Sequence, residues 1–188
     1  MTIQPPVPRP LTREQYYELG RQGYFDGRRV ELIFGEVIEM SPINWPHVVG
    51  CRKTAELLET VFAGVAWIGR NDPLDLTHSD PQPDVSVIAG RFENYADHPT
   101  TALLVVEVAD ATLSYDLTTK AELYATAGIL EYWVLDVTGR ELHVFRDPLA
   151  NASLGITAYQ SRQTFGPADS VSPLAVPTAS VRVADLLP

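Results

Sequence analysis

The segment from Ala102 to Lys120 constrains the fold of this chain more than any other. Its first part, Ala102–Val108, is a continuous apolar run broken only by Glu107, which is typical of a strand buried on both faces. A buried carboxylate is costly unless a cation, a hydrogen-bond donor or solvent meets it. After a short polar connection, a helix is predicted to begin at Asp116 and to carry Lys120 in its first turns. The segment therefore predicts a strand, a loop and a helix that bring an acid and an amine close together.

A second predicted strand, Pro83–Ile88, has Asp84 at its start. Magnesium prefers hard oxygen ligands, commonly one or two carboxylates together with water and a substrate phosphate. A bound ion of this kind polarises a phosphoryl oxygen and lowers the pKa of its water, and a nearby amine can neutralise the developing charge. Asp84, Glu107 and Lys120 therefore suit a metal-assisted site for phosphodiesters. Glu31 would add a third carboxylate or a water-bridged contact.

Each of these residues also has an ordinary structural interpretation. An aspartate after a proline commonly makes backbone hydrogen bonds where a strand begins, and this interpretation is favoured for Asp84 taken alone. Glu31 in a hairpin is more often solvated, and Lys120 on a helix is ordinarily a surface lysine. Glu107 is the better candidate, because buried acids are rare unless paired. Lys120 gains some weight because the chain has 12 arginines and only two lysines, so a compact amine has been kept where a guanidinium is the default.

The rest of the chain alternates between helical and strand patterns. Thr12 and Gln15 resemble a capping box, and the apolar spacing after Pro46 has the period of a helix. The predicted elements are a helix over 13–19, a hairpin of 30–33 and 36–40 around Gly35, a helix from Pro46 to about Phe62, strands at 65–68, 131–136, 141–146 and 156–164, and a final segment at 181–187. The helix after Asp116 is predicted to end at Ala127, with Gly128 as its left-handed cap. This order indicates an α/β fold with one central sheet and helices packed against it.

Other chemical motifs are weak. His47 and Cys51 share a helix face at a spacing of four residues, which suits a metal, but no further soft ligands lie nearby in the sequence. His47 could instead reach the mouth of the site. No glycine-rich phosphate loop, nucleophile elbow or HExxH motif is present, which argues against nucleotide hydrolysis by a P-loop and against serine or zinc hydrolysis.

Length and composition predict one domain over residues 12–188, preceded by a flexible proline-rich arm over residues 1–11. The single cysteine, Cys51, excludes an internal disulfide and fits a reducing cytoplasm. No apolar run reaches the length of a membrane span.

The charge of the chain opposes strong sequence-independent binding of nucleic acid. The formal net charge is −10, and residues 31–147 contain 19 of the 24 acidic residues but only 7 of the 14 basic ones. Proteins that bind nucleic acid without sequence preference usually carry a basic face. The flanks are slightly basic, and five arginines near the start could line one rim: Arg9, Arg13, Arg21, Arg28 and Arg29.

Taken in order, these motifs resemble a known family. The residues that carry the resemblance are Val30–Ile33 followed by Gly35, Pro83–Val87, Val106–Val108, Asp116 to Lys120 with Tyr124 and Gly128, and Glu131–Trp133. They resemble the Uma-two family of putative restriction endonucleases, in the PD-(D/E)XK, restriction-endonuclease-like superfamily. The resemblance covers roughly residues 12–146. It implies a central mixed β-sheet flanked by helices, Mg²⁺ (or Mn²⁺) held by Asp84, Glu107 and the backbone carbonyl of Val108, and Glu31 as the acid of the first motif.

The sequence departs from the superfamily pattern at one position. Ala109 stands two residues after Glu107, where the signature has lysine. In the family that this chain resembles, the lysine of the signature lies on the following helix, and Lys120 is similar to that lysine. Asp116, one turn earlier, is expected to face the same way.

The sequence therefore predicts a metal-dependent endonuclease that hydrolyses DNA phosphodiesters by metal-activated water, and a homodimer. The main alternative is a catalytically silent binding or assembly module with the same fold, which the acidic charge favours. A less favoured alternative is metal-dependent hydrolysis of a small phosphoester.

Overall fold

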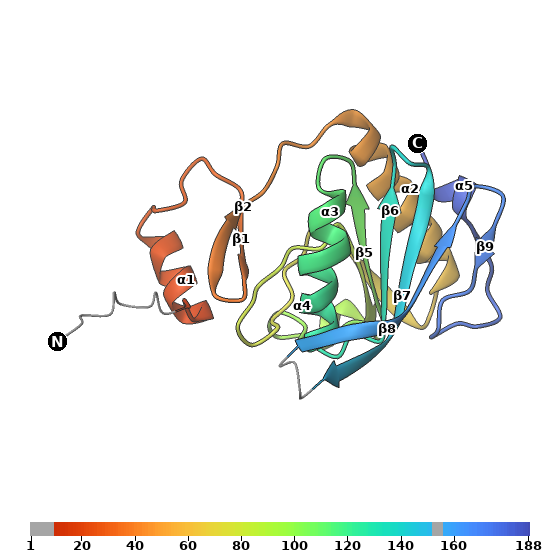
Figure 1. Cartoon of the computed structure of the whole chain (residues 1–188). Coiled ribbons are helices and arrows are strands. Elements are labelled where there is room, and N and C mark those ends of the chain that lie inside the picture. Colours follow the sequence, from red (N-terminus) through yellow and green to blue (C-terminus); the bar gives the residue numbers. More distant parts are fainter. Residues whose placement is uncertain (1–9, 152–155) are drawn as a thin grey trace.

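Six strands form the central sheet, in the order β3-β4-β5-β6-β7-β8. Figure 1 labels β5 to β8 of this sheet. The structure, a computed structural model, describes residues 10–151 and 156–188. Only β5 and β6 pair in parallel, and the other neighbours are antiparallel. The strands are Ala66–Gly69 (β3), Val85–Ala89 (β4), Leu104–Ala109 (β5), Glu131–Asp136 (β6), Glu141–Asn151 (β7) and Ile156–Phe165 (β8). The expected α/β fold with a central mixed sheet is confirmed.

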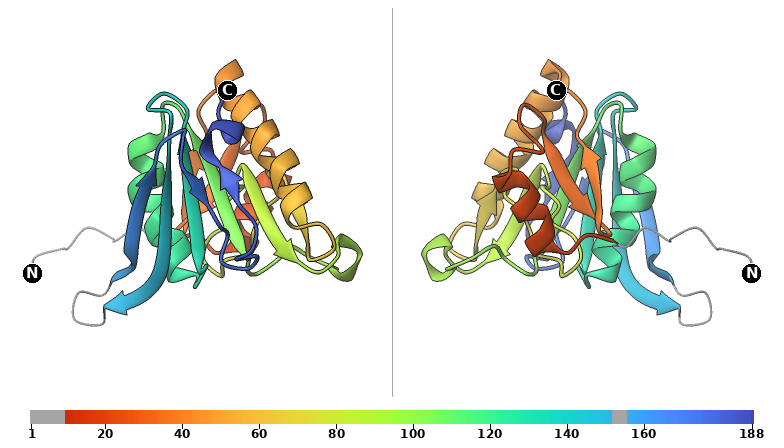
Figure 2. Two further views of the ribbon diagram at one scale, coloured as in Figure 1. Left: turned by 90° about the vertical axis from the view of Figure 1, so that its right-hand side faces the viewer. Right: turned by 90° about the vertical axis from the view of Figure 1, so that its left-hand side faces the viewer.

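Helices cover both faces of this sheet (Figure 2). The long helix α2 (Trp45–Val61) and the short α5 (Val183–Leu186) lie on one face, and the helical segment after β5 lies on the other. Because successive strand residues point to opposite faces, β5 contributes to two cores: Val106 and Val108 pack on the α2 side, and Val105 and Ala109 on the other. Burial on both faces explains the continuous apolar run in the sequence.

The helical segment after β5 differs from the prediction. It begins three residues earlier than expected, with α3 (Leu113–Tyr115), then makes one π-helical turn, η2 (Asp116–Lys120), before α4 (Ala121–Thr126). A π turn has an extra residue in the helix, and such turns frequently occur at functional sites. The periodicity of the sequence contains no signal for this extra residue. Gly128, with φ of +73°, is the predicted left-handed cap.

The N-terminal part lies at one end of the sheet. It consists of α1 (Arg13–Arg21), which has the predicted capping box, and a separate hairpin of β1 (Val30–Ile33) and β2 (Glu36–Glu39). The turn requires Gly35, because its φ is +78° and a Cβ there would lie 2.9 Å from the Cα of Pro10. A β-bridge from Leu32 to Asp80 attaches the hairpin to the segment before β4. This contact brings β1 close to the start of β4.

The remaining elements are short. They are the 3-10 turn η1 (Phe92–Asn94) and a two-stranded sheet of β9 (Ser170–Val171) and β10 (Val181–Arg182). Within the described part of the chain, no helix has the length and apolar character needed to cross a membrane. Positions 1–9 of the expected arm lie outside the described residues, and the division into an arm and one domain stays a prediction.

Candidate active site

One cavity of about 310 Å³ collects the candidate residues from four parts of the fold. Glu31 comes from β1, Asp84 from the residue before β4, Glu107 from β5, and Lys120 from the π turn. The antiparallel pairing of Val85 with Val106 places Asp84 beside Glu107. All four residues are at most 8% exposed. The structure therefore brings the four predicted side chains together. The ordinary interpretation, a solvated Glu31 and a surface Lys120, does not hold, because both side chains are buried.

The amine of Lys120 lies between two carboxylates. Its Nζ donates to Oε2 of Glu31 at 2.7 Å and to Oε1 of Glu107 at 3.2 Å. Burial disfavours the charged amine, but the charges of Glu107 and Glu31 outweigh it, so the pKa of Lys120 is raised. The cavity therefore holds a permanently charged ammonium group.

Glu107 accepts hydrogen bonds at both of its oxygens. The hydroxyl of Tyr124, one turn after Lys120, donates to Oε1 at 2.7 Å, and the backbone N–H of Asp84 donates to Oε2 at 3.3 Å. Burial raises the pKa of Glu107 to about 8; Lys120 opposes this shift, and the neighbouring acids add to it. The carboxyl is therefore held in place but takes up a proton readily in the metal-free protein.

Asp84 contacts both the strand β5 and the helix α2. Its Oδ2 accepts from the backbone N–H of Val108 at 2.8 Å, and its Oδ1 lies 3.1 Å from Nε2 of His47 on α2. The side chain of Asn44 caps α2 by accepting from the N–H of His47 at 3.1 Å, which fixes the start of the helix. The sequence pattern favoured His47 only weakly as a site residue, and the structure places it in the lining of the cavity.

Asp116 lies on the same cavity, as the spacing of four residues from Lys120 predicted. Thr112 donates to its Oδ2 at 2.6 Å, and the hydroxyl of Tyr132 donates to its backbone oxygen at 3.0 Å. Burial raises the pKa of Asp116 to about 6, although the Thr112 hydrogen bond and the Lys120 charge lower it. Tyr124 is a supporting residue that chemical reasoning missed, although its spacing of four residues from Lys120 was a usable signal.

The cavity contains more acid than base, and this imbalance fits a cation. Four buried carboxyl groups face it, from Glu31, Asp84, Glu107 and Asp116, and Lys120 is the buried ammonium that opposes them. Burying several carboxylates together is unfavourable unless a proton or a metal ion compensates. Carboxylate oxygens are the ligands that Mg²⁺ and Mn²⁺ prefer. The residues present therefore fit a divalent ion.

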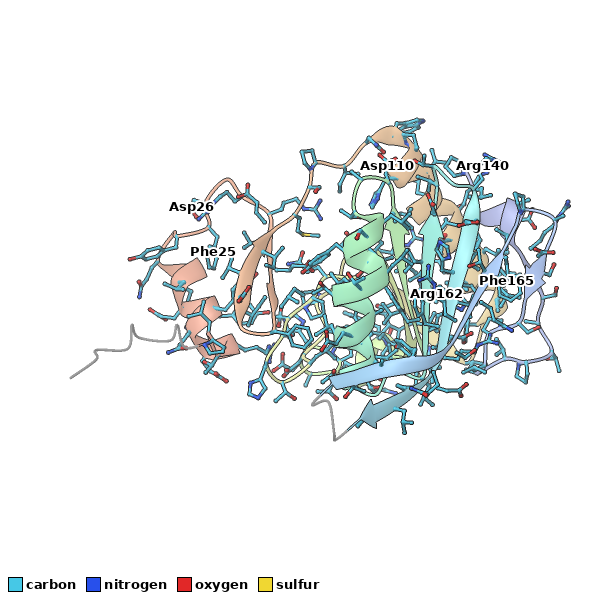
Figure 3. All side chains as sticks on the ribbon, in the orientation of Figure 1. Phe25, Asp26, Asp110, Arg140, Arg162 and Phe165 are labelled. Carbon is cyan, nitrogen blue, oxygen red and sulfur yellow. The ribbon has the colours of Figure 1, made fainter. Side chains whose placement is uncertain are left out.

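A second cavity, of about 240 Å³, adjoins the first and shares Ile43, His47 and Asp84 with it. It extends along α2 to Arg52 and to Arg70, which follows β3. On the other side, Asp110 accepts a hydrogen bond from Thr138 at 2.9 Å, beside the β6–β7 turn. Figure 3 labels Asp110 and Arg140 at this same end of the sheet. The two cavities therefore adjoin each other at His47 and Asp84.

Residues 13–184 match the model of the Uma2 family, described as "Putative restriction endonuclease". The chain belongs to the Uma2 family. The match covers all the elements that carry the candidate site, so the suspected resemblance is confirmed, and the family supports a nuclease-like function.

A solved structure has the same fold. The crystal structure of a putative nuclease belonging to DUF820, from Anabaena variabilis, matches with a TM-score of 0.74 and 18% sequence identity, over 94% of this chain and 97% of that one. At this identity the likeness shows the fold. A comparison with curated proteins found no match.

Proposed function

We propose that this Uma2 protein is a divalent-metal-dependent endonuclease that hydrolyses DNA phosphodiesters. The observation that carries the proposal is the ammonium group of Lys120, held between Glu31 and Glu107 in a cavity that also contains Asp84. Hydrolysis of a phosphodiester requires stabilisation of negative charge that grows on the phosphate oxygens. A buried ammonium beside carboxylate metal ligands meets this requirement.

Asp84, Glu107 and the backbone carbonyl of Val108 would hold Mg²⁺ or Mn²⁺. When bound, such an ion lowers the pKa of its water and polarises the phosphoryl oxygen. The Val108 amide fixes the Asp84 carboxylate through its hydrogen bond at 2.8 Å, and Tyr124 fixes Glu107 at 2.7 Å. These contacts keep the two carboxylates oriented before the substrate arrives.

Lys120 donates from a fixed position. Two carboxylates accept from its Nζ, at 2.7 Å and 3.2 Å, which leaves one N–H of the ammonium for the phosphate or the attacking water. Glu31 thus acts mainly on the lysine, by keeping it charged and in place. Burial raises the pKa of Glu107, so binding of an ion to this carboxylate would be linked to the release of a proton.

The arginines that line the two adjoining cavities support a strand of nucleic acid as the substrate. Arg29 lines the first cavity, and Arg52 and Arg70 line the second, where Arg70 also pairs with Glu59 at 2.6 Å. Arginine recognises phosphate through its planar fork of donors. The arginines that line the two cavities would therefore attract phosphate locally, although the net charge of −10 repels DNA as a whole.

The net charge also favours the second candidate, a catalytically silent module with the same fold. The absence of lysine at Ala109, two residues after Glu107, points the same way. This candidate predicts metal binding or DNA binding without turnover.

A homodimer in the cytoplasm completes the proposal. Two symmetric sites suit cleavage of both strands of a duplex, and closed symmetric dimers are the commonest oligomers. Light scattering should give twice the mass of the chain, and a monomer at every workable concentration would contradict the dimer.

A panel of labelled DNA substrates tests the function. Duplex, single-stranded and branched DNA are incubated with Mg²⁺ or Mn²⁺, and Asp84→Asn serves as the inactive control. We expect metal-dependent cleavage that the variant lacks. Intact DNA across the panel, with metal and DNA both bound, would favour the silent module.

A further inference from the structure

His47 lies where a further ligand of the metal ion would lie. Its Nε2 is 3.1 Å from Oδ1 of Asp84, and its side chain is 18% exposed. The ring borders both cavities, on the side of Asp84 that faces α2. The ring therefore lies beside Asp84, one of the groups proposed to hold the ion, and lines the same cavity as Glu107 and Val108.

We propose that His47 ligates the metal ion held by Asp84 and gives the site a preference for Mn²⁺ over Mg²⁺. This inference rests on the proposed function, because it concerns the same ion. Two neighbouring ligands of an octahedral ion at about 2.1 Å are about 3 Å apart. The observed separation of the His47 nitrogen from the Asp84 oxygen, 3.1 Å, has this value without movement of either element.

The chemistry of the ligand set determines the preferred ion. Magnesium is bound almost entirely by oxygen, whereas imidazole nitrogen suits transition ions. Asp84, Glu107 and the Val108 carbonyl alone would serve either ion. With His47 the set contains both nitrogen and oxygen, and a transition ion gains a contact that Mg²⁺ uses poorly.

Cys51 is not part of the proposed set, although its sulfur lies within 4.8 Å of the His47 and Asp84 ligand atoms. Thiolate sulfur is a soft ligand that suits Zn²⁺ or Cu⁺ rather than Mg²⁺ or Mn²⁺. Cys51→Ala is therefore a useful control beside the proposed ligand.

The alternative role for His47 is that of a positioning residue, which donates a hydrogen bond to Asp84 and never touches the ion. Glutamine at position 47 separates the two roles, because its side-chain amide also donates a hydrogen bond but its nitrogen is not a metal ligand. A positioning role predicts that His47→Gln changes Mn²⁺ and Mg²⁺ binding equally or not at all.

The experiment measures metal binding to the full-length, metal-free protein without any substrate. Calorimetry gives the affinities for Mn²⁺ and Mg²⁺, and pulsed EPR of bound Mn²⁺ detects coupling to a ligand ¹⁴N nucleus. We expect a nitrogen coupling in the parent protein that His47→Gln lacks. The variant should lose Mn²⁺ affinity by at least about tenfold, which is the size of effect expected when a side chain that supports a metal site is removed. Its Mg²⁺ affinity should change by about twofold or less.

Two variants serve as controls, and each outcome decides. His78→Gln changes another histidine, exposed and away from both cavities, and should keep the coupling and both affinities, as should Cys51→Ala. Bound Mn²⁺ without nitrogen coupling would overturn the role of His47 and leave the proposed metal site standing. Failure of the parent protein to bind either ion would overturn both.

Discussion

The amine of Lys120 and the carboxylate of Glu31 lie 2.7 Å apart, although 89 residues separate them in the sequence. The contact joins the N-terminal hairpin to the helix that follows β5. Both side chains are 5% exposed, so the pair is shielded from water and from salt. Lys120 therefore contributes to the attachment of the hairpin as well as to the charge of the cavity.

Replacement of Lys120 by methionine is predicted to remove both contributions. Cleavage should stop, because the group that stabilises the growing negative charge is lost. Removal of one partner of a buried pair typically costs about 3–5 kcal/mol of unfolding free energy. The loss should be larger at pH 9 than at pH 6, because Glu107 can take up a proton at the lower pH. Urea denaturation at both pH values and a cleavage assay measure these effects.

Lys53→Met is the matched control, because Lys53 is the other lysine of the chain and its Nζ donates to the backbone oxygen of Leu187 at 2.5 Å, outside the site. It should cleave at the parent rate. Lys120→Arg should not restore full turnover, since a planar guanidinium cannot replace a compact ammonium. Parent-rate cleavage by Lys120→Met would leave this lysine with no catalytic role.

Glu107 predicts an unusual dependence of stability on pH in the metal-free protein. Its pKa is raised from 4.5 to about 8 by burial, so between these values the folded state binds more protons than the unfolded state. The unfolding free energy should therefore fall as pH rises from about 4.5 to 8. Asp116, raised from 3.8 to about 6, adds to the lower part of this fall. Lys120 does not change this dependence. Its pKa is raised from 10.5 in the folded state, so its contribution to the unfolding free energy is constant below that pH and falls only above it.

Glu107→Gln tests the assignment. Its amide does not titrate, so stability should change less between pH 6 and 8 than in the parent protein. Urea denaturation across this range measures the slope. An unchanged slope in the variant would assign the proton uptake to another group.

A bound metal ion should reverse the effect of crowded carboxylates. Mg²⁺ or Mn²⁺ binds the folded state, so the melting temperature should rise with metal concentration. The unfolding free energy should increase by about 2.7 kcal/mol when the metal concentration is 100 times the dissociation constant. Asp84→Asn should lose this rise. Asp147→Asn, a change of an exposed aspartate in β7, should keep it. Thermal scans at increasing metal concentration provide the measurement, and an equal rise in both variants would place the ion elsewhere.

Arg52 is predicted to contact the DNA strand beyond the metal ligands. Arg52→Ala should weaken DNA binding and reduce its dependence on salt by about one phosphate contact, with metal affinity unchanged. Arg91→Ala is the control, because Arg91 is equally cationic but follows the opposite end of β4 from Asp84. Anisotropy titrations at several salt concentrations, with Ca²⁺ in place of Mg²⁺, separate binding from cleavage. Equal losses of DNA affinity in both variants would indicate a diffuse electrostatic attraction rather than a contact between Arg52 and the DNA strand.

The sequence predicted most of the fold because its signals are local. The apolar run of β5, the capping box of α1 and the glycine of the β1–β2 turn each depend on residues next to one another. The helix after β5 was placed correctly, but its start at Leu113 and its π turn were missed. An extra residue in a helix depends on what the turn packs against, which is a tertiary property.

The site was predictable for a different reason in each residue. Glu107 was conspicuous as an acid in an apolar strand, whereas Glu31 and Lys120 are buried by contacts between segments that lie far apart in the sequence. His47 was underestimated because its partner Asp84 lies on another element, 37 residues away. Contacts of this kind have no local pattern in the sequence.

The position of the lysine on a helix, separate from the strand that carries Glu107, affects how related proteins can be recognised. A search for an acid and a lysine at the fixed interval of one intervening residue would pass over this chain, because Ala109 occupies that position. Lys120 instead lies 13 residues after Glu107, beyond the loop between β5 and α3. Proteins of this kind are better sought by the spatial arrangement of three carboxylates around one amine than by any spacing along the chain.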